Sequence, residues 1–408
     1  MRRRSFLKMA GVGGAAGLAG LPSAAKVATS PPMKITRVRF YLNPGSGPTF
    51  NQSSHIVTIE TDQGITGVGE GGSKDMVEQC AAMLIGEDPS RIDHLWQMMF
   101  RGYFYPAGRE KLDALGALDL ALWDIKGKAL GVPVSDLLGG VSRDHIECYS
   151  TGFPSRGSLK ETARACIEAG FRAYRHATAT LAEGEPFNAH QMVAQTYQDC
   201  VEIRAGVGPD GDWALDYHTR LDFPDAVRLS TLIEPLAPYF AEDLVRSENP
   251  GIYRELRQHV KVPIAVGEQF GSKWDVSELI EQQLIDYARV TIPNVGGITE
   301  YMKIQALCET HYVGLIPHST GPISEAALVH ACSVFSGPVL MEMSMDGHHN
   351  YAHLPESYDF RNGKLWPNRR PGLGVTLDTK PLQLAVEITE PKRPIPMLHR
   401  SDGSITNW

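Results

Sequence analysis

Cysteine is scarce in this chain, with six residues among 408. None has the paired or close spacing that is typical of a disulfide framework or a zinc site. Most fall within apolar helix or strand patterns, so we interpret them as reduced, packed side chains. They stand at positions 80, 148, 166, 200, 308 and 332. These observations exclude a small disulfide-stabilised protein, and the length fits a large barrel-sized domain with an additional one.

A long apolar run is also lacking. The candidate at residues 9–21 is rich in glycine and alanine and has thirteen residues, whereas a membrane-spanning helix needs about 20. It follows Arg3-Arg4 and precedes small residues at 23–25. This pattern is typical of a twin-arginine export signal. We therefore expect residues 1–28 to be a signal peptide and the mature protein to be periplasmic; a basic start on a cytoplasmic enzyme is the alternative.

The sequence has no basic stripe. It holds 39 lysine and arginine residues against 47 acidic ones, a net charge of −8. Loss of residues 1–28 would change this to −13, because five basic residues and no acidic residue would be removed. An acidic protein of this kind is a poor binder of nucleic acid or anionic membrane. We expect a small-molecule partner, no nucleic acid, and no membrane after signal removal.

Two regions with different patterns follow the signal. Residues 34–145 begin with strand-like alternation, including a hairpin pattern over residues 55–70. Helical periodicity then dominates over residues 74–130, most clearly at residues 112–128, and Gly131 and Pro133 end it. Strands followed by helices predict an α+β capping domain.

From residue 146 onward strands and helices alternate, which predicts an α/β fold with a parallel TIM-type barrel. The candidate strands end near Ser150, Arg175, Asp216, Glu242, Glu268, Thr291, Ile316 and Glu342. We assign residues 146–354 to the barrel. Residues 355–408 form a C-terminal segment, and residues 371–375 are expected to cross back onto the capping domain.

Three acidic residues stand at equal intervals: Asp216, Glu242 and Glu268 are each 26 residues apart and close or follow short apolar runs. A strand and its returning helix take roughly this many residues, and the strand ends of a parallel barrel meet at one mouth. Three converging carboxylates would repel one another unless a hard cation held them. Oxygen ligands favour Mg²⁺, with Mn²⁺ possible. Three surface acids at strand ends by chance are the alternative.

The chain resembles the mandelate racemase/muconate lactonizing enzyme-like branch of the enolase superfamily, and within it the galactonate-type acid-sugar dehydratases. The resemblance covers nearly all of residues 34–380. It rests on residues 67–70 (GVGE), 119–128 (DLALWDIKGK), 216–218 (DYH), Glu242, Glu268, 296–300 (GGITE), 317–319 (PHS) and 371–375 (PGLGV). It implies a (β/α)₇β barrel beneath an N-terminal capping domain that the C-terminal segment completes.

The resemblance also implies a chemistry. Mg²⁺ on the three acids would stabilise the enolate that forms when a proton is removed next to a substrate carboxylate, and sites of this superfamily combine Mg²⁺ with a histidine or lysine base. His318 would take that proton, and His218 would protonate the departing β-hydroxyl, giving a 2-keto-3-deoxy acid. Glu342 would hydrogen-bond a substrate carboxylate oxygen. A structural role is the alternative for each histidine, and packing or solvent contact for Glu342.

Two residues depart from the family pattern. Racemases of this branch carry a Lys-x-Lys at the end of the second strand, where this chain has Arg175 and Ala177. Arginine is a poor base but can pair with a substrate carboxylate or hydroxyl, so the change favours dehydration over two-base racemisation. The aspartate that orients the seventh-strand histidine in the family is expected to be replaced here by Asn294. An amide does not stabilise imidazolium as a carboxylate would.

Substrate specificity is expected to come from the capping domain, through Asn51, Tyr103 and Arg109, whose side chains could stack on or hydrogen-bond a polyhydroxy acid. A core position for Tyr103 is the alternative. The resemblance further implies a homo-oligomer. An epimerase or cycloisomerase that uses the same enolate, and a non-catalytic sugar-acid binding protein, are the other functions that the sequence allows.

Overall fold

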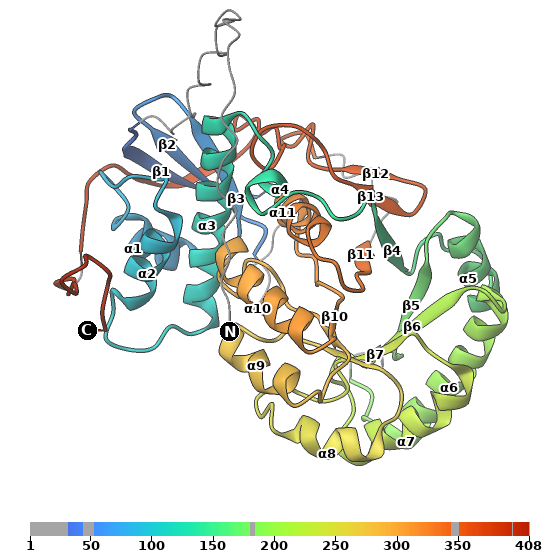
Figure 1. Cartoon of the computed structure of the whole chain (residues 1–408). Coiled ribbons are helices and arrows are strands. Elements are labelled where there is room, and N and C mark those ends of the chain that lie inside the picture. Colours follow the sequence, from blue (N-terminus) through green and yellow to red (C-terminus); the bar gives the residue numbers. More distant parts are fainter. Residues whose placement is uncertain (1–31, 44–52, 180–183, 344–350, 394, 408) are drawn as a thin grey trace, which may run out of the picture.

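The computed structural model describes residues 32–43, 53–179, 184–343, 351–393 and 395–407. Within these ranges the chain forms a four-stranded sheet with helices beside a barrel (Figure 1). The predicted signal peptide, residues 1–28, and the predicted substrate-binding residue Asn51 lie outside the described residues. No helix in the described ranges is long and apolar enough to cross a membrane.

The N-terminal unit is built on an antiparallel sheet in the order β14-β1-β2-β3. β2 and β3 form the predicted hairpin, whose turn includes Gly64 at φ +73°, a conformation that glycine adopts without steric cost. β14 pairs with β1, so the C-terminal segment adds a strand to this sheet. The strands are β1 (Ile35–Leu42), β2 (Ile56–Thr61), β3 (Thr66–Glu70) and β14 (Gln383–Ile388).

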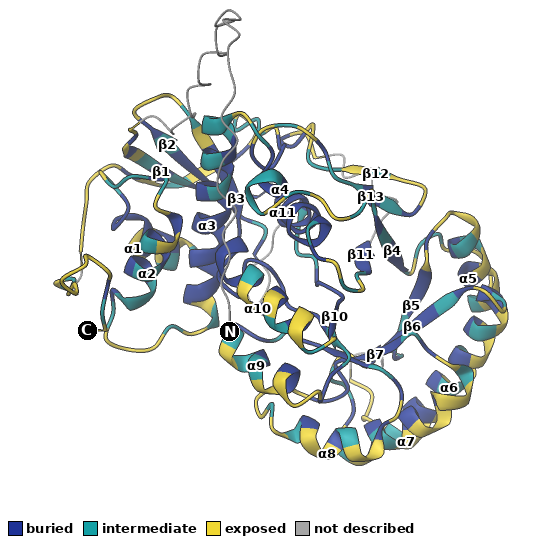
Figure 2. Ribbon diagram, in the orientation of Figure 1, coloured by how far each residue is buried: buried dark blue, intermediate teal, exposed yellow. Residues whose placement is uncertain are grey.

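Helix α3 is buried on almost every side because it lies between this sheet and the barrel (Figure 2). It packs so closely on β3 that a Cβ atom at Gly67 or Gly69 would lie 2.1 or 1.9 Å from a carbonyl oxygen of the helix, which explains both glycines. It ends at Gly131, which has φ +69°. The helices of this unit are α1 (Lys74–Ala81), α2 (Ile92–Arg101), α3 (Arg109–Leu130) and α4 (Val134–Leu137).

Among the described residues, eight parallel strands form the barrel. They follow one another from β4 to β10, and β11 pairs with β4 to close the ring. Small and aromatic side chains such as Tyr149, Ala214 and Phe240 fill the interior. The strands are β4 (Ile146–Thr151), β5 (Ala173–Ala177), β6 (Asp212–Asp216), β7 (Phe240–Glu242), β8 (Ile264–Val266), β9 (Tyr287–Ala288), β10 (Gly314–Leu315) and β11 (Met341–Met343).

In the described part of the chain seven helices cover the barrel, one after each of the first seven strands, so the predicted (β/α)₇β arrangement is confirmed. A short hairpin, β12 (Asp359–Arg361) and β13 (Lys364–Trp366), adds to the edge of β4. The helices are α5 (Leu159–Glu168), α6 (Ala189–Val207), α7 (Phe223–Ile233) with the 3₁₀ turn η1 (Glu234–Leu236), α8 (Ile252–His259), α9 (Lys273–Glu281), α10 (Ile298–Thr310) and α11 (Pro322–Ser333).

Buried acids of the capping unit hold the starts of two barrel helices. Glu70, the last residue of β3, accepts hydrogen bonds from the backbone N–H groups of Ile323 and Ser324 at 3.1 and 2.8 Å. Asp119 on α3 accepts bonds from the N–H and hydroxyl of Thr299 at 3.0 and 2.5 Å. The N-terminus of a helix favours negative charge because its first N–H groups lack partners. These two acids therefore fix the helices that follow β9 and β10 against the capping unit.

His330 on α11 is a buried histidine that joins three segments. Its Nδ1 faces the backbone N–H of Ser135 at 3.3 Å, and its Nε2 faces the carbonyl oxygen of Leu373 at 3.1 Å. Both contacts suit a neutral ring that accepts at Nδ1 and donates at Nε2. Burial lowers the pKa of His330 from 6.5 to about 4, although the Leu373 carbonyl opposes the shift.

The depressed pKa of His330 predicts acid sensitivity. Between pH 6.5 and 4 the unfolded chain binds a proton at this ring that the folded chain does not bind, so stability falls as pH falls. From the pKa of about 4, we expect a loss of about 3 kcal/mol across this window. Urea unfolding of the native protein and of His330→Gln at pH 7 and pH 4 isolates the effect. If the difference in the free energy of unfolding between the two proteins were the same at pH 7 and pH 4, the prediction would be contradicted.

Candidate active site at the barrel mouth

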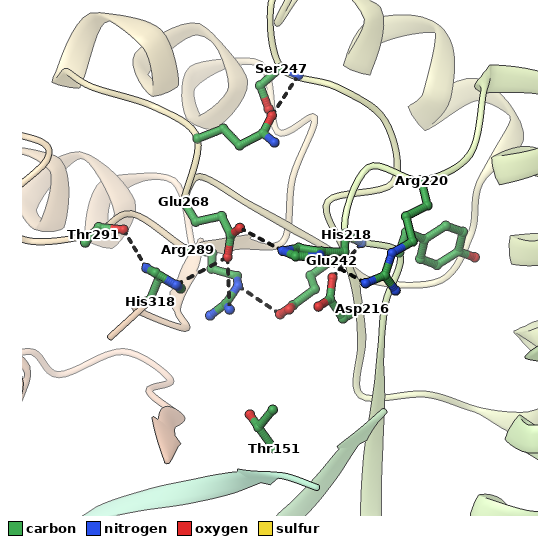
Figure 3. Close-up of polar contacts among 12 residues, drawn as sticks. Thr151, Asp216, His218, Arg220, Glu242, Ser247, Glu268, Arg289, Thr291 and His318 are labelled. Carbon is green, nitrogen blue, oxygen red and sulfur yellow. Dashed lines mark hydrogen bonds and ion pairs between the residues drawn. The ribbon is translucent and has the colours of Figure 1, made fainter. Parts of the chain in front are cut away.

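The three equally spaced acids do meet at the mouth of the barrel. Asp216 and Glu242 end neighbouring strands β6 and β7 in direct register, and Glu268 follows β8 by two residues. Figure 3 shows the three side chains close together, with His218 and His318 on either side of Glu268. Glu342 on β11 completes an acidic group of four. The convergence predicted from the 26-residue spacing is confirmed.

Arg175 on β5 lies among these acids. Its Nη1 is 2.7 Å from Asp216 Oδ2 and also donates to Glu242 Oε1. Its Nη2 is 3.3 Å from Glu342 Oε1. The side chain is largely buried but reaches the mouth. The predicted substrate-binding arginine is therefore paired with three carboxylates in this structure.

A second arginine, which the sequence analysis missed, lies beneath the acids. The Nε of Arg289 is 2.9 Å from Glu242 Oε2. Its Nη2 is 3.3 Å from Glu268 Oε2 and 3.0 Å from Glu342 Oε2, and its Nη1 donates to the Tyr149 hydroxyl at 2.8 Å. A lone arginine between Ala288 and Val290 was the available signal, because a charge in a buried strand needs partners.

Burial and charge act against each other on these acids. Burial raises the pKa of Glu242 to about 8, helped by the charges of Asp216 and Glu342 and opposed by the two arginines. Burial would also raise the pKa of Glu342, but Arg289 and Arg175 outweigh it and hold that pKa well below its ordinary value. At Glu242 the two arginines therefore offset only part of the effect of burial and of the neighbouring carboxylates.

The two predicted catalytic histidines share one carboxylate. His218 Nε2 is 3.8 Å from Glu268 Oε1, and His318 Nε2 is 3.5 Å from Glu268 Oε2 (Figure 3). The His218 side chain is 53% exposed and that of His318 only 9%. His218 has φ +49°, and its backbone N–H donates to Asp216 Oδ1 at 2.6 Å. The rings thus approach the same space from opposite sides, which suits proton transfers on two sides of one substrate.

The residue that orients His318 is Thr291, and the prediction of Asn294 is wrong. Thr291 Oγ1 is 2.8 Å from His318 Nδ1. Thr291 follows β9 and bridges to His318 in the neighbouring strand, whereas Asn294 comes three residues later in the turn before α10. The Asn294 amide nitrogen is buried without a hydrogen-bond partner among the described residues. Burial lowers the pKa of His318, and a hydroxyl cannot offset this as a carboxylate could.

The donor set suits a divalent cation. Asp216, Glu242, Glu268 and Glu342 are four carboxylates that face two guanidinium groups and two histidine rings, and oxygen donors of this kind suit Mg²⁺. As the side chains stand, no three acidic, histidine or cysteine residues in the described ranges are close enough to hold a metal together. The Nη1 of Arg175 fills the space between Asp216 and Glu242. The residues therefore fit a divalent cation once this nitrogen withdraws.

Two family models match the chain. The mandelate racemase / muconate lactonizing enzyme N-terminal domain matches residues 41–139. The enolase C-terminal domain-like model matches residues 158–381, more than half of the chain. The chain belongs to the enolase superfamily. The two matches fall on the capping unit and the barrel, and they place it in the mandelate racemase/muconate lactonizing enzyme-like branch.

Individual members of the superfamily cover nearly the whole chain. A D-galactonate dehydratase from Ralstonia pickettii (strain 12J) is 34% identical over 92% of this chain and 100% of its own length. The structure of a putative dehydratase from Zymomonas mobilis ZM4 is 27% identical with a TM-score of 0.80, covering 88% of this chain and 100% of that one. An enolase from Pantoea ananatis with bound D-gluconate and Mg is 28% identical with a TM-score of 0.74, covering 85% and 93%. This superfamily member is an enzyme of the hydro-lyase class.

The other two predicted substrate-binding residues, Arg109 and Tyr103, both have contacts within the protein. Arg109 donates to the backbone carbonyls of Glu268 and Gln269 at 2.7 and 2.9 Å, so its guanidinium is committed to the segment after β8. The Tyr103 ring lies over the Lys111 ammonium at 4.0 Å and lines a surface groove beside α1 and β14. Direct substrate contact by either residue stays a prediction. The sequence placed both residues in the right domain but could not give their direction.

Asp243 is a further acid of this region that the sequence analysis passed over. Both of its carboxylate oxygens are buried without a hydrogen-bond partner among the described residues. Its backbone has φ +47°, which asparagine tolerates better than most residues. Burial raises the pKa of Asp243 well above its ordinary value, and the charges of Glu268 and Glu242 add to this. This residue therefore costs the fold stability.

Asp243→Asn is expected to stabilise the protein. Because Asp243 is fully buried and lacks a hydrogen-bond partner among the described residues, removing its charge should raise the free energy of unfolding by about 1–3 kcal/mol. Urea unfolding at pH 7.5 measures the change. Asp286→Asn is the matched control, since Asp286 accepts bonds from Ile264 and Arg257 at 2.8 and 2.5 Å and should lose stability when changed. Equal losses in both variants would contradict the prediction.

Proposed function

We propose that this enzyme is a Mg²⁺-dependent dehydratase of a sugar acid of the aldonate type. The observation that carries the proposal is the convergence of Asp216, Glu242 and Glu268 at one mouth, with His218 and His318 flanking the third acid. The full-length similarity to a D-galactonate dehydratase and to a structure holding D-gluconate and Mg supports this substrate class.

Three residues would hold the metal: Asp216, Glu242 and Glu268. When bound, Mg²⁺ or Mn²⁺ supplies positive charge that stabilises the negative charge developing on the substrate carboxylate. Arg175 at the mouth would pair with a substrate carboxylate or hydroxyl oxygen. Glu342 is held by Arg289 at 3.0 Å and by the Thr151 hydroxyl at 3.2 Å, and its lowered pKa makes it an acceptor. In place of the predicted bond to a substrate carboxylate oxygen, it would accept a hydrogen bond from a substrate hydroxyl. These groups place the acid end of the substrate beside both histidines.

The two histidines divide the proton transfers. Removing the proton next to the carboxylate requires an unprotonated Nε2 on His318, so its Nδ1–H must donate to Thr291 Oγ1. The buried ring with a lowered pKa is held in this neutral form. His218, on the other side of Glu268, would give a proton to the departing β-hydroxyl. Loss of water then leaves an enol that becomes a 2-keto-3-deoxy acid.

A sugar-acid library tests the proposal. The mature enzyme with Mg²⁺ is incubated with aldonates that differ in configuration, and 2-keto acid is detected with semicarbazide. We expect at least one aldonate to give a keto acid, with no product when EDTA is present. Deuterium uptake next to the carboxylate without net loss of substrate would instead indicate an epimerase or cycloisomerase. Binding without deuterium uptake would indicate a sugar-acid binding protein.

We also propose that the enzyme is exported to the periplasm by the twin-arginine route. The support is the sequence of residues 1–28, with Arg3-Arg4 before a mildly apolar stretch and small residues near position 24. A folded enzyme can carry a bound metal through this route. Fractionation of cells that produce the full chain tests the proposal, and an unprocessed protein confined to the cytoplasm would contradict it.

A further inference from the structure

The two arginines of the site differ in how firmly they are held. Arg289 is 1% exposed, and its guanidinium contacts Glu242, Glu268, Glu342 and the fully buried Tyr149. Arg175 is 8% exposed. Its ion pairs in the described residues use Nη1 and Nη2 alone, whereas the Nε of Arg289 is also paired, at 2.9 Å from Glu242 Oε2. Neither arginine can lose its charge at ordinary pH. Arg289 is therefore a fixed cation below the acids, and Arg175 is a looser one beside them.

The arginines also contact different oxygens of the same acids. Arg289 forms ion pairs with the Oε2 atoms of Glu242, Glu268 and Glu342. Arg175 Nη1 donates hydrogen bonds to Glu242 Oε1 and Asp216 Oδ2. Arg175 Nη1 lies between Asp216 and Glu242, two of the three residues that would hold the metal, so a metal bound by all three would compete with it. Arg289 leaves these oxygens accessible, but its positive charge remains next to the metal position.

We propose that Arg289 is a built-in counter-cation that weakens the site's affinity for a divalent metal, and that Arg175 is the side chain that the metal displaces. This inference rests on the proposed function and adds a sequence of events to it. The four carboxylates and the neighbouring Asp243 outnumber the two guanidinium groups, so a divalent cation would offset negative charge that the arginines leave uncompensated. Displacement of Arg175 by the metal would free its guanidinium for the substrate carboxylate, so metal and substrate would bind cooperatively.

Calorimetric titration of the mature protein with Mg²⁺ tests the role of Arg289. We expect Arg289→Gln to bind Mg²⁺ at least about tenfold more tightly than the parent, because like charges in a buried site repel strongly. Arg289→Lys keeps the charge and should stay within about threefold of the parent. Tyr149→Phe is a matched control that removes one contact of Arg289 at 2.8 Å without changing charge, and its Mg²⁺ affinity should equal the parent's. Far-UV circular dichroism confirms that each variant is folded.

A crystal structure of the parent with Mg²⁺ covers the case in which Arg289→Gln does not fold. We expect Arg289 to keep its contacts with Glu242 and Glu342 while Arg175 leaves Asp216. Withdrawal of Arg289 instead of Arg175 would overturn the inference. So would a folded Arg289→Gln variant whose Mg²⁺ affinity is no tighter than the parent's, and in that case the proposed function would stand. If neither the parent nor any variant bound Mg²⁺, the result would contradict both this inference and the proposed function.

Discussion

Replacement of His318 by asparagine is expected to lower exchange of the proton next to the substrate carboxylate by about 10²- to 10⁴-fold, the range that a positioned general base supplies. The Nε2 of His318 lies 3.5 Å from Glu268 at the mouth, and Thr291 fixes the ring from the other side. Asparagine can keep the contact with Thr291 but cannot accept a proton. Proton NMR in deuterated buffer, with a sugar acid that the library experiment identifies, measures the exchange.

Mg²⁺ binding separates a catalytic role of His318 from a structural one. His318 contacts Glu268, one of the three proposed metal ligands, and is not itself a proposed ligand. The Mg²⁺ affinity of His318→Asn should therefore stay within about threefold of the parent's, a small change in free energy. His259→Asn is a suitable control, because His259 is an exposed residue at the end of α8 and its ring lies against Phe223 on the outside of the barrel. Unchanged exchange in His318→Asn would reject this residue as the base.

Replacement of His218 by asparagine is expected to suppress dehydration by about 10²- to 10⁴-fold while exchange of the same proton continues. His218 Nε2 approaches Glu268 from the side opposite His318, and its ring is exposed enough to reach a substrate hydroxyl. Without its proton the β-hydroxyl is a poor leaving group, so the enolate returns to substrate. Keto-acid formation and deuterium uptake are measured in the same sample.

The ratio of the two rates is the informative quantity for His218. A large fall in keto-acid formation with deuterium uptake retained within a few-fold would assign the acid to His218. Equal loss of both reactions would contradict the division of roles between the two histidines. The backbone of His218 has φ +49° and its N–H contacts Asp216. Asparagine tolerates this backbone conformation, which makes it a better replacement than alanine.

Distances along the chain determined the acidic centre of the site. In a parallel barrel every strand ends at the same mouth, so residues that close successive strands converge whatever the helices between them contain. Asp216, Glu242 and Glu268 could therefore be placed from their spacing, and His218 and Glu342 followed from their positions beside strand ends. The same reasoning located the capping unit, since an antiparallel hairpin followed by helices cannot continue a parallel barrel.

Contacts between side chains were decided only by the tertiary structure. Thr291, rather than Asn294, faces His318 because strand register sets which residue lies opposite the imidazole, and a turn after the strand breaks that register. Arg109 donates to a backbone carbonyl of Glu268 because the fold brings the start of α3 beside the segment that follows β8. The pairing of Arg289 with three acids depends on strands distant along the chain, so its charge could be seen in the sequence but its partners could not. The sequence by itself determined which carboxylates meet, because strand ends converge by topology. Only the folded chain decided which cations share the mouth with them, because that depends on the direction of each side chain.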